Sequence, residues 1–270
     1  MTLTEKNEKL RNYLGGLGSL AVAFSGGVDS TFLLKTAQEV LGDKALAVTA
    51  KSRLIPPREI EEARAFCAQE GIRHIILEIN EMEIEGMAKN PPDRCYLCKK
   101  ALFTKIIALA KEQGIAHVAE GSNTDDAADY RPGRKALAEL NIECPMVQAE
   151  LSKGEIRQLS RDLGLPGWDR PPFACLASRI PYGEEISPAR LEMIAQAEEI
   201  LLGLGFFQFR VRCHGNLARI ETDQAGFALL SSPELRERIH REFKAIGFAY
   251  TSMDLLGYRM GSLNEILSAS

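Results

Sequence analysis

Several features that would place this chain outside the ordinary enzymes are missing from its sequence. No stretch approaches the roughly 20 consecutive apolar residues that a membrane helix needs, and no apolar run follows residues 1–6 as in an export signal. The 33 basic and 37 acidic residues give a formal net charge of -4, and the pI is about 5.7. This balance argues against a large nucleic-acid interface and against a membrane partner. We therefore expect a cytoplasmic protein.

Cysteine is too scarce for a disulfide scaffold. The chain has six cysteines and no export signal, so each thiol is expected to be core filler, ligand or nucleophile. We find no internal repeat and no low-complexity tract. A chain of 270 residues is too long for one small core, so we expect one large domain and a smaller one.

Short apolar runs alternate with helical segments through the first part of the chain. This alternation predicts an α/β fold, a doubly wound and mostly parallel sheet with helices on both faces. We expect this α/β fold to form the first domain, residues 1–185. The expected strands are 20–24, 45–49, 75–77, 117–120 and, more weakly, 146–147; the expected helices are 29–41, 56–70, 94–112 and 152–164.

A different pattern follows at residues 186–270, which we predict to be a second, smaller α/β domain. Strict alternation over 207–213 is typical of a half-buried strand. We expect neighbouring strands at 217–222 and 248–255. Helices are expected over 189–202 and from about Pro233 onward.

The segment Ser25-Gly26-Gly27-Val28-Asp29-Ser30 lies between a predicted buried strand and a predicted helix. The two glycines let backbone N–H groups approach phosphate oxygens, and the helix directs its positive end at them. No lysine follows the glycines, which argues against the phosphate loop of kinases and GTPases. We predict a site for the phosphates of ATP.

A second polar segment, Gly121-Ser122-Asn123-Thr124-Asp125-Asp126, also follows a predicted strand. Ligands of doubly wound sheets collect at such strand ends, and the carboxylates are suited to Mg²⁺. Arg131 and Lys153 are expected to neutralise the departing pyrophosphate.

Two cysteines, Cys95 and Cys98, lie three residues apart in the first turn of a predicted helix, which is ligand spacing. Because Leu102 and Ile106 continue the same face, a core position is the alternative. A third thiol, Cys175, lies in a proline-rich loop.

Arginines gather on the polar face of the second domain's strands. Arg210 and Arg212 alternate along one strand, and Arg219 and Glu221 along the next. Such a cluster suits a phosphate or carboxylate ligand, and a solvated, salt-bridged sheet face is the alternative.

The segment 25–30 resembles the PP-loop of the ATP pyrophosphatases. Together, the motifs described above resemble the LarE family over nearly the whole chain. The resemblance rests on the PP-loop, the segment 121–126, Tyr130-Arg131-Pro132-Gly133, the loop 175–183, and residues 210–212 and 218–221. It implies an ATP-dependent sulfur transferase. Its implied substrate is pyridinium-3,5-biscarboxylic acid mononucleotide, whose carboxylates are adenylated and converted to thiocarboxylates. Family members form homo-oligomers.

The resemblance also implies roles for the thiols and arginines. In one branch of the family the cysteine corresponding to Cys175 gives up its own sulfur. This chain adds Cys95 and Cys98 and so resembles another branch, in which three cysteines hold a [4Fe-4S] cluster that carries the sulfur. We prefer the cluster, with the sacrificial cysteine as alternative. Substrate binding is expected from Ser178, Arg179, Arg210 and Arg212, with Glu221 orienting an arginine.

Two other functions fit part of the same pattern. A PP-loop tRNA thiolase also combines ATP use with cluster-binding cysteines, but the pI of about 5.7 argues against it. An ATP-binding module with structural zinc is the non-catalytic alternative.

Overall fold

Residues 1–128, 132–171 and 174–265 are described by a computed structural model, in which the chain forms two units of packing. Unit 1 comprises Met1–Asn80 and Cys95–Pro172, and unit 2 comprises Glu81–Arg94 and Phe173–Ser270. The units therefore divide near residue 172, and residues 81–94 belong to the second. The expected domain boundary at 185/186 stays a prediction.

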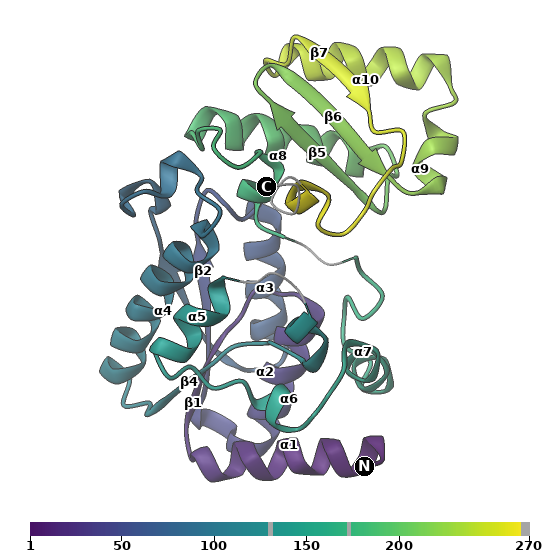
Figure 1. The fold of residues 1–270 in the computed structure, drawn as a ribbon. Coiled ribbons are helices and arrows are strands. Elements are labelled where there is room, and N and C mark those ends of the chain that lie inside the picture. The colour runs from purple at the N-terminus through teal and green to yellow at the C-terminus, as the bar shows by residue number, and fades with distance from the viewer. Residues whose placement is uncertain (129–131, 172–173, 266–270) are drawn as a thin grey trace. The chain divides into compact units, whose positions relative to one another are not determined.

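A four-stranded parallel sheet forms the centre of unit 1 (Figure 1). The strands are β1 (Leu20–Ala23), β2 (Ala45–Lys51), β3 (Arg73–Glu78) and β4 (His117–Ala119), in the order β3-β2-β1-β4. Its helices are α1 (Leu3–Leu17), α2 (Val28–Leu41), α3 (Pro57–Gln69), α4 (Arg94–Glu112), α5 (Gly133–Glu139), α6 (Pro145–Gln148) and α7 (Lys153–Asp162). Arg94, the first residue of α4, is counted with unit 2.

Alternate residues of the central strand β1 enter two different cores. Leu20 and Val22 pack in one core with side chains of α1, α2 and α3. Ala21 lies in a second core with Phe103 and Ile106 of α4. Both sheet faces are thus covered, which confirms the predicted doubly wound α/β fold.

Two local features differ from the sequence-based expectation. Residues 146–147 were expected as a weak strand, but they lie in the short helix α6. Pro145 occupies the first turn of that helix, where its fixed φ is favourable, and Met146 is fully buried. Helix α1 was not expected, although Thr2 and Glu5 form a capping box at its start.

Unit 2 is built on a three-stranded sheet, β5 (Phe209–His214), β6 (Leu217–Thr222) and β7 (Tyr250–Met253). β5 and β6 are antiparallel, and β6 and β7 are parallel. Its helices are α8 (Pro188–Gly203), α9 (Gln224–Leu229) and α10 (Pro233–Ala245), and a short 3₁₀ helix η5 spans Leu176–Arg179. α8 packs on β5 and α10 on β7, as expected for a small α/β unit. Among the described residues, none of the helices has the length and apolar character to cross a bilayer.

Tight packing of α9 on β6 gives a test of unit 2. A Cβ atom at Gly226 would lie 1.8 Å from Oγ1 of Thr222, which is buried. We expect Gly226→Ala to lower the free energy of unfolding of this unit by about 1–3 kcal/mol, because the added methyl overpacks the site. Gly154→Ala in α7 is the control, since no atom lies within 4 Å of its Cβ position. Equal urea midpoints for both variants would contradict this packing.

Candidate active site

The loop after β1 has the geometry of a phosphate cradle. Gly26 has a φ of 75°, a conformation that glycine adopts without strain. The Ser25 and Ser30 hydroxyls lie 3.1 Å apart, and Ser30 Oγ donates to the Gly27 carbonyl at 3.1 Å. α2 begins directly after Gly27, which supplies no side-chain cap. The first-turn N–H groups of α2 are therefore placed to receive an anion.

The loop after β4 lies against this cradle because β1 and β4 are parallel neighbours. A Cβ atom at Gly121 would lie 3.0 Å from the Ser30 backbone nitrogen and 3.3 Å from the Asp29 carbonyl carbon. Only glycine allows the two backbones to approach this closely. Because the sheet order reverses between β1 and β4, both loops lie at a switch point, where doubly wound folds bind ligands.

Polar side chains from three segments meet at Asp29. Lys153 Nζ donates to one carboxylate oxygen of Asp29 at 2.5 Å, and Asn123 Nδ2 donates to the other at 3.5 Å. Asp125 accepts from the Lys153 backbone N–H at 3.0 Å, and Asp126 accepts from the Asn123 N–H at 3.0 Å. The structure thus brings together the predicted carboxylates of the two loops and Lys153.

The charge state of Asp29 follows from this packing. Burial raises the pKa of Asp29 above its ordinary value, although the Lys153 ammonium opposes the shift. Lys153 thus supplies a positive charge directly beside the Asp29 carboxylate. Arg131, the other predicted cation, lies outside the described residues.

The first turn of α4 carries Cys95 and Cys98, both half-buried, followed by Lys99. Lys99 Nζ contacts Glu120 at 3.0 Å, and the other Glu120 oxygen accepts from the Ser122 N–H at 2.9 Å. Burial works to raise the pKa of Glu120, but Lys99 and the hydrogen bonds from Ser122 together keep the pKa below its ordinary value. This pair links the cysteine turn to the nucleotide loops, and the sequence analysis missed both members. Glu120 directly precedes Gly121, and that position was the available signal.

The thiols differ sharply in their surroundings. Cys67 and Cys213 are buried, and burial raises the pKa of Cys67 to about 12. Burial and the neighbouring Glu120 raise the pKa of Cys144 to about 12 as well. Cys175 is exposed, and Cys95 and Cys98 are half-buried. Accessibility therefore fits a ligand or nucleophile role for Cys95, Cys98 and Cys175 better than for Cys67 and Cys213. Cys144 is as accessible as Cys95 and Cys98, but its raised pKa disfavours the thiolate.

No metal centre is visible in these side chains. In the part of the chain that the structure describes, no three histidine, cysteine, aspartate or glutamate residues gather as a metal-binding group. Cys95 and Cys98 belong to unit 1 and Cys175 to unit 2. The three-cysteine cluster stays a prediction.

In unit 2 the loop of Cys175 is held by Arg179, which is 1% exposed. Its NH1 group donates to the carbonyl oxygens of Ala174 and Cys175, the latter at 3.1 Å, and to Ser178 Oγ at 3.0 Å. Its Nε and NH2 groups donate to the two oxygens of Glu198 at 2.9 and 2.8 Å. Burial works to raise the pKa of Glu198, but Arg179, Arg210 and the Val211 N–H together keep this pKa below its ordinary value. Arg179 thus fixes the backbone around Cys175.

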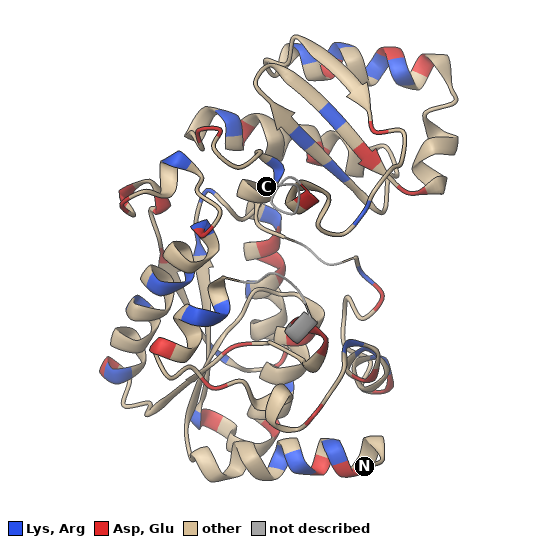
Figure 2. Ribbon diagram, viewed as in Figure 1, with Lys and Arg blue, Asp and Glu red and all other residues tan. Residues whose placement is uncertain are grey.

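The arginine face of β5 is buried, whereas the alternation predicted a half-buried strand. All residues from Phe209 to Cys213 are buried. Arg212 donates to Glu221 at 2.6 Å, to Ser262 Oγ at 3.0 Å and to the Ser178 carbonyl at 2.8 Å. These partners compensate the charge and allow burial. Figure 2 shows basic and acidic residues side by side in this sheet.

Arg210 lies 5.0 Å from the centre of the Tyr258 ring, and its NH1 donates to the Phe209 carbonyl at 2.5 Å. Burial lowers the pKa of Arg210 to about 10, and nearby Arg179 adds to the shift. Arg179, Arg210 and Arg212 therefore form one buried group with Glu198 and Glu221. Glu198 was not predicted, since it lies on α8 without a motif around it.

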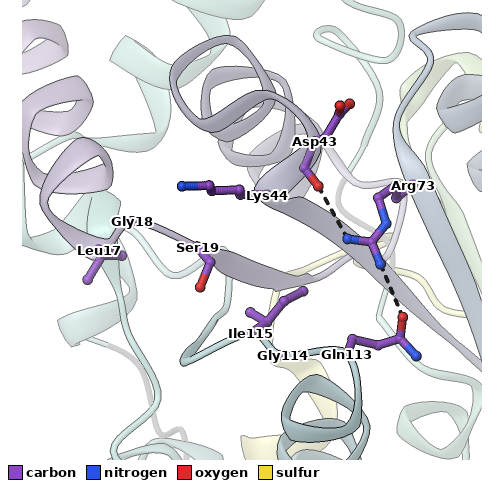
Figure 3. A pocket seen from close by; sticks show the side chains of 9 residues that line it. All are labelled: Leu17, Gly18, Ser19, Asp43, Lys44, Arg73, Gln113, Gly114 and Ile115. Carbon is purple, nitrogen blue, oxygen red and sulfur yellow. Dashed lines mark hydrogen bonds between the residues drawn. The ribbon is translucent and has the colours of Figure 1, made fainter.

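A separate cavity of about 430 Å³ opens at the opposite edge of the parallel sheet (Figure 3). It lies by the starts of the strands, where Arg73 donates to the Asp43 carbonyl at 3.2 Å and to Gln113 at 3.1 Å. The nucleotide loops lie at the other ends of the same strands, so the cavity is no part of the candidate active site.

Comparisons with known proteins agree with this geometry. A sequence profile of the NAD synthase family matches residues 3–130. The pyridinium-3,5-bisthiocarboxylic acid mononucleotide synthase of Lactiplantibacillus plantarum is 34% identical over 99% of this chain and 96% of its own. An uncharacterized protein of Synechocystis sp. is 42% identical over 98% of this chain and 99% of its own. An uncharacterized protein of Methanocaldococcus jannaschii is 29% identical over 96% of this chain and 99% of its own.

The parallel sheet and its glycine-rich loop define a PP-loop enzyme that uses ATP. Within that class the full-length similarity is decisive, and the chain belongs to the LarE family, that of the Lactiplantibacillus synthase.

The close approach of the two loops gives a prediction at Gly121. We expect Gly121→Ala to raise the dissociation constant of Mg·ATP by about ten-fold, because the methyl displaces the backbone at Ser30. Gly203→Ala, with no atom within 4 Å, is the control. Isothermal titration measures both. Unchanged affinity in the Gly121 variant would contradict the prediction, because the two loops would then accommodate the methyl group without weaker Mg·ATP binding.

The Lys153–Asp29 pair predicts a pH effect. Mg·ATP binding needs the Asp29 carboxylate ionised, so binding should weaken as the pH falls through its raised pKa. Lys153→Met removes the cation that opposes this shift, so the pKa rises further and binding is lost at a higher pH. Lys153→Arg keeps the charge and should resemble the wild type. Identical pH profiles for the Lys153→Met variant and the wild type would exclude the Lys153–Asp29 pair from Mg·ATP binding.

Proposed function

We propose that the protein is an ATP-dependent sulfur transferase that acts on pyridinium-3,5-biscarboxylic acid mononucleotide and converts its carboxylates to thiocarboxylates. The observation that carries this proposal is the end-to-end similarity to the bisthiocarboxylic acid mononucleotide synthase in a chain that pairs a PP-loop with accessible thiols. Ser25, Gly26, Gly27 and the start of α2 would bind the ATP phosphates. Asp29, with Asp125 and Asp126, would hold Mg²⁺.

The first step is adenylation. A substrate carboxylate oxygen attacks the α-phosphorus, and the bond from that phosphorus to the bridging oxygen breaks. Pyrophosphate leaves with the electron pair, held by Mg²⁺, Lys153 and Arg131. Lys153 must exchange its Asp29 partner for phosphate in this step.

The second step transfers sulfur. A sulfur nucleophile attacks the activated carbonyl carbon, the bond to the AMP oxygen breaks, and AMP leaves with the electron pair. A [4Fe-4S] cluster bound by Cys95, Cys98 and Cys175 would supply this sulfur and leave the protein intact. The alternative donor is Cys175 itself, whose thiolate displaces AMP to form a thioester. A base then removes the Cα proton, and the Cβ–Sγ bond breaks with its electron pair on sulfur, which leaves a thiocarboxylate on the product and dehydroalanine in the chain. Cys175 is exposed, which suits both routes.

The buried arginine group of unit 2 would bind the anionic substrate. Arg210, Arg212 and Ser178 are the candidate ligands, and Glu221 holds Arg212 in place at 2.6 Å. Because Arg179 donates to Glu198 and to oxygens of the Cys175 loop, we assign it a supporting role in which it holds that loop.

The decisive experiment measures iron and acid-labile sulfide in protein purified without oxygen. We expect about four irons per chain in the wild type, and a loss of iron in Cys95→Ala. Cys144→Ala is the matched control, since it removes another partly buried thiol of unit 1. Iron in the control but not in Cys95→Ala supports the cluster.

The same samples test the reaction. With ATP and the mononucleotide, mass spectrometry should detect replacement of oxygen by sulfur in the product, with pyrophosphate release. Iron-free protein that loses sulfur from Cys175 would instead establish the sacrificial route. If no thiolated product forms with any sulfur source, the proposed function is wrong.

A further inference from the structure

A fully buried asparagine, Asn90, joins two segments of unit 2 that are far apart in sequence. Its Nδ2 group donates to the carbonyl oxygens of Ile180 at 3.1 Å and Pro181 at 2.7 Å. Its backbone carbonyl accepts from the Gly183 N–H at 3.0 Å. The residue is 0% exposed. We call these contacts, with those of Arg94 below, the Asn90 clasp.

The chemistry of the clasp requires an asparagine. Both Nδ2 hydrogens and Oδ1 are used, and the backbone N–H donates to the Met87 carbonyl at 3.0 Å. Aspartate would lack the two donors, and its oxygens would face carbonyl oxygens. Asn90 also has a φ of 52°, which asparagine tolerates better than most residues. A merely space-filling residue would need none of these properties.

The second arm of the clasp reaches the residue that precedes Cys95. Arg94 NH1 donates to Asn90 Oδ1 at 2.6 Å, and the guanidinium lies 4.3 Å from the centre of the Tyr182 ring. Arg94 is 4% exposed, and among the described residues its Nε atom has no hydrogen-bond partner. Within the described part of unit 2, the guanidinium contacts Asn90 and Tyr182 rather than a carboxylate. Its position therefore depends on the clasp.

On the other side, the clasp meets the loop of Cys175. Ile180 directly follows Arg179, which binds the Cys175 carbonyl. Hydrogen bonds thus join Arg94 to Asn90 and Asn90 to residues 180–181, and the backbone leads from there to Arg179, which binds the Cys175 carbonyl. Arg94 is also the first residue of α4, and Cys95 is the next.

We propose that Asn90 is a positioning residue for the sulfur-transfer step: within unit 2 the clasp ties the segment that ends at Arg94 to the loop that carries Cys175. This inference rests on the proposed function of the two cysteines. It assigns a role to residues 81–94, which leave unit 1 and return to it directly before the cysteine pair. It predicts that loosening the clasp impairs the thiol site without impairing ATP binding.

The test compares Asn90→Gly with Asn141→Gly in the full chain. Both asparagines have a φ of 52°, so glycine relieves any strain equally, but Asn141 is exposed and lies in unit 1. In Asn90→Gly we expect amide hydrogen exchange over residues 174–186 to accelerate by about ten-fold or more, since buried hydrogen bonds are lost. Iron should pass to a chelator about ten-fold faster. The KM for ATP should stay within about two-fold while kcat for thiolation falls about ten-fold.

A second variant keeps the proposal testable if Asn90→Gly misfolds. Arg94→Met breaks only the arm toward Cys95 and leaves the Nδ2 bonds of Asn90 in place. We expect it to lose iron faster than wild type while exchange at Gly183 stays slow. A variant that holds iron like the wild type would remove Arg94 from the clasp and overturn the positioning role.

The outcomes separate the two proposals. If the wild type thiolates substrate and Asn90→Gly matches Asn141→Gly in exchange, iron loss and kcat, the inference is wrong while the proposed function stands. If the wild type holds no iron and thiolates nothing, the proposed function is wrong. In that case unchanged exchange and unchanged alkylation of Cys175 by iodoacetamide in Asn90→Gly would overturn the clasp as well, whereas faster rates would support its hold on Cys175.

Discussion

The parallel pairing of β1 with β4 is the constraint on which the nucleotide site depends. It brings two loops to one edge of the sheet, and Gly121 lets the second loop touch the start of α2. Because of this contact, Asn123 lies beside Asp29, and Lys153 reaches the same carboxylate. The phosphate cradle is thus a product of strand order, and its side chains refine a site that the backbone has already formed.

Buried charge organises the second unit in a comparable way. In the buried arginine group, Arg179 pairs with Glu198 and Arg212 pairs with Glu221. Both arginines also donate hydrogen bonds to loop carbonyls or hydroxyls. Such a group is costly to desolvate and is kept in place only by good geometry. A group of this kind gives up stability for a rigid arrangement of its guanidinium groups.

The sequence predicted most of unit 1 because its signals are local. An apolar run followed by Ser-Gly-Gly gave β1, the loop and α2, and the capping box at Ser152 gave the start of α7. The strand predicted at residues 146–147 was wrong, because two apolar residues do not show whether a segment is a strand or a buried helical turn. Glu198 and the Asn90 clasp could not be predicted, since they depend on partners up to 91 residues away in the sequence. The burial of Arg210 and Arg212 was missed for the same reason.

The interleaving of the two units has a consequence for how the protein is made. Residues 81–94 leave the ribosome long before residues 173–265, with which they pack. Unit 1 is likewise interrupted, so its β4 and α7 arrive only after the segment that belongs elsewhere. Neither unit can be completed by a continuous fragment, and the buried contacts of Asn90 form only after residues 180–183 have been synthesised. Folding of the loop that carries Cys175 is therefore a late event.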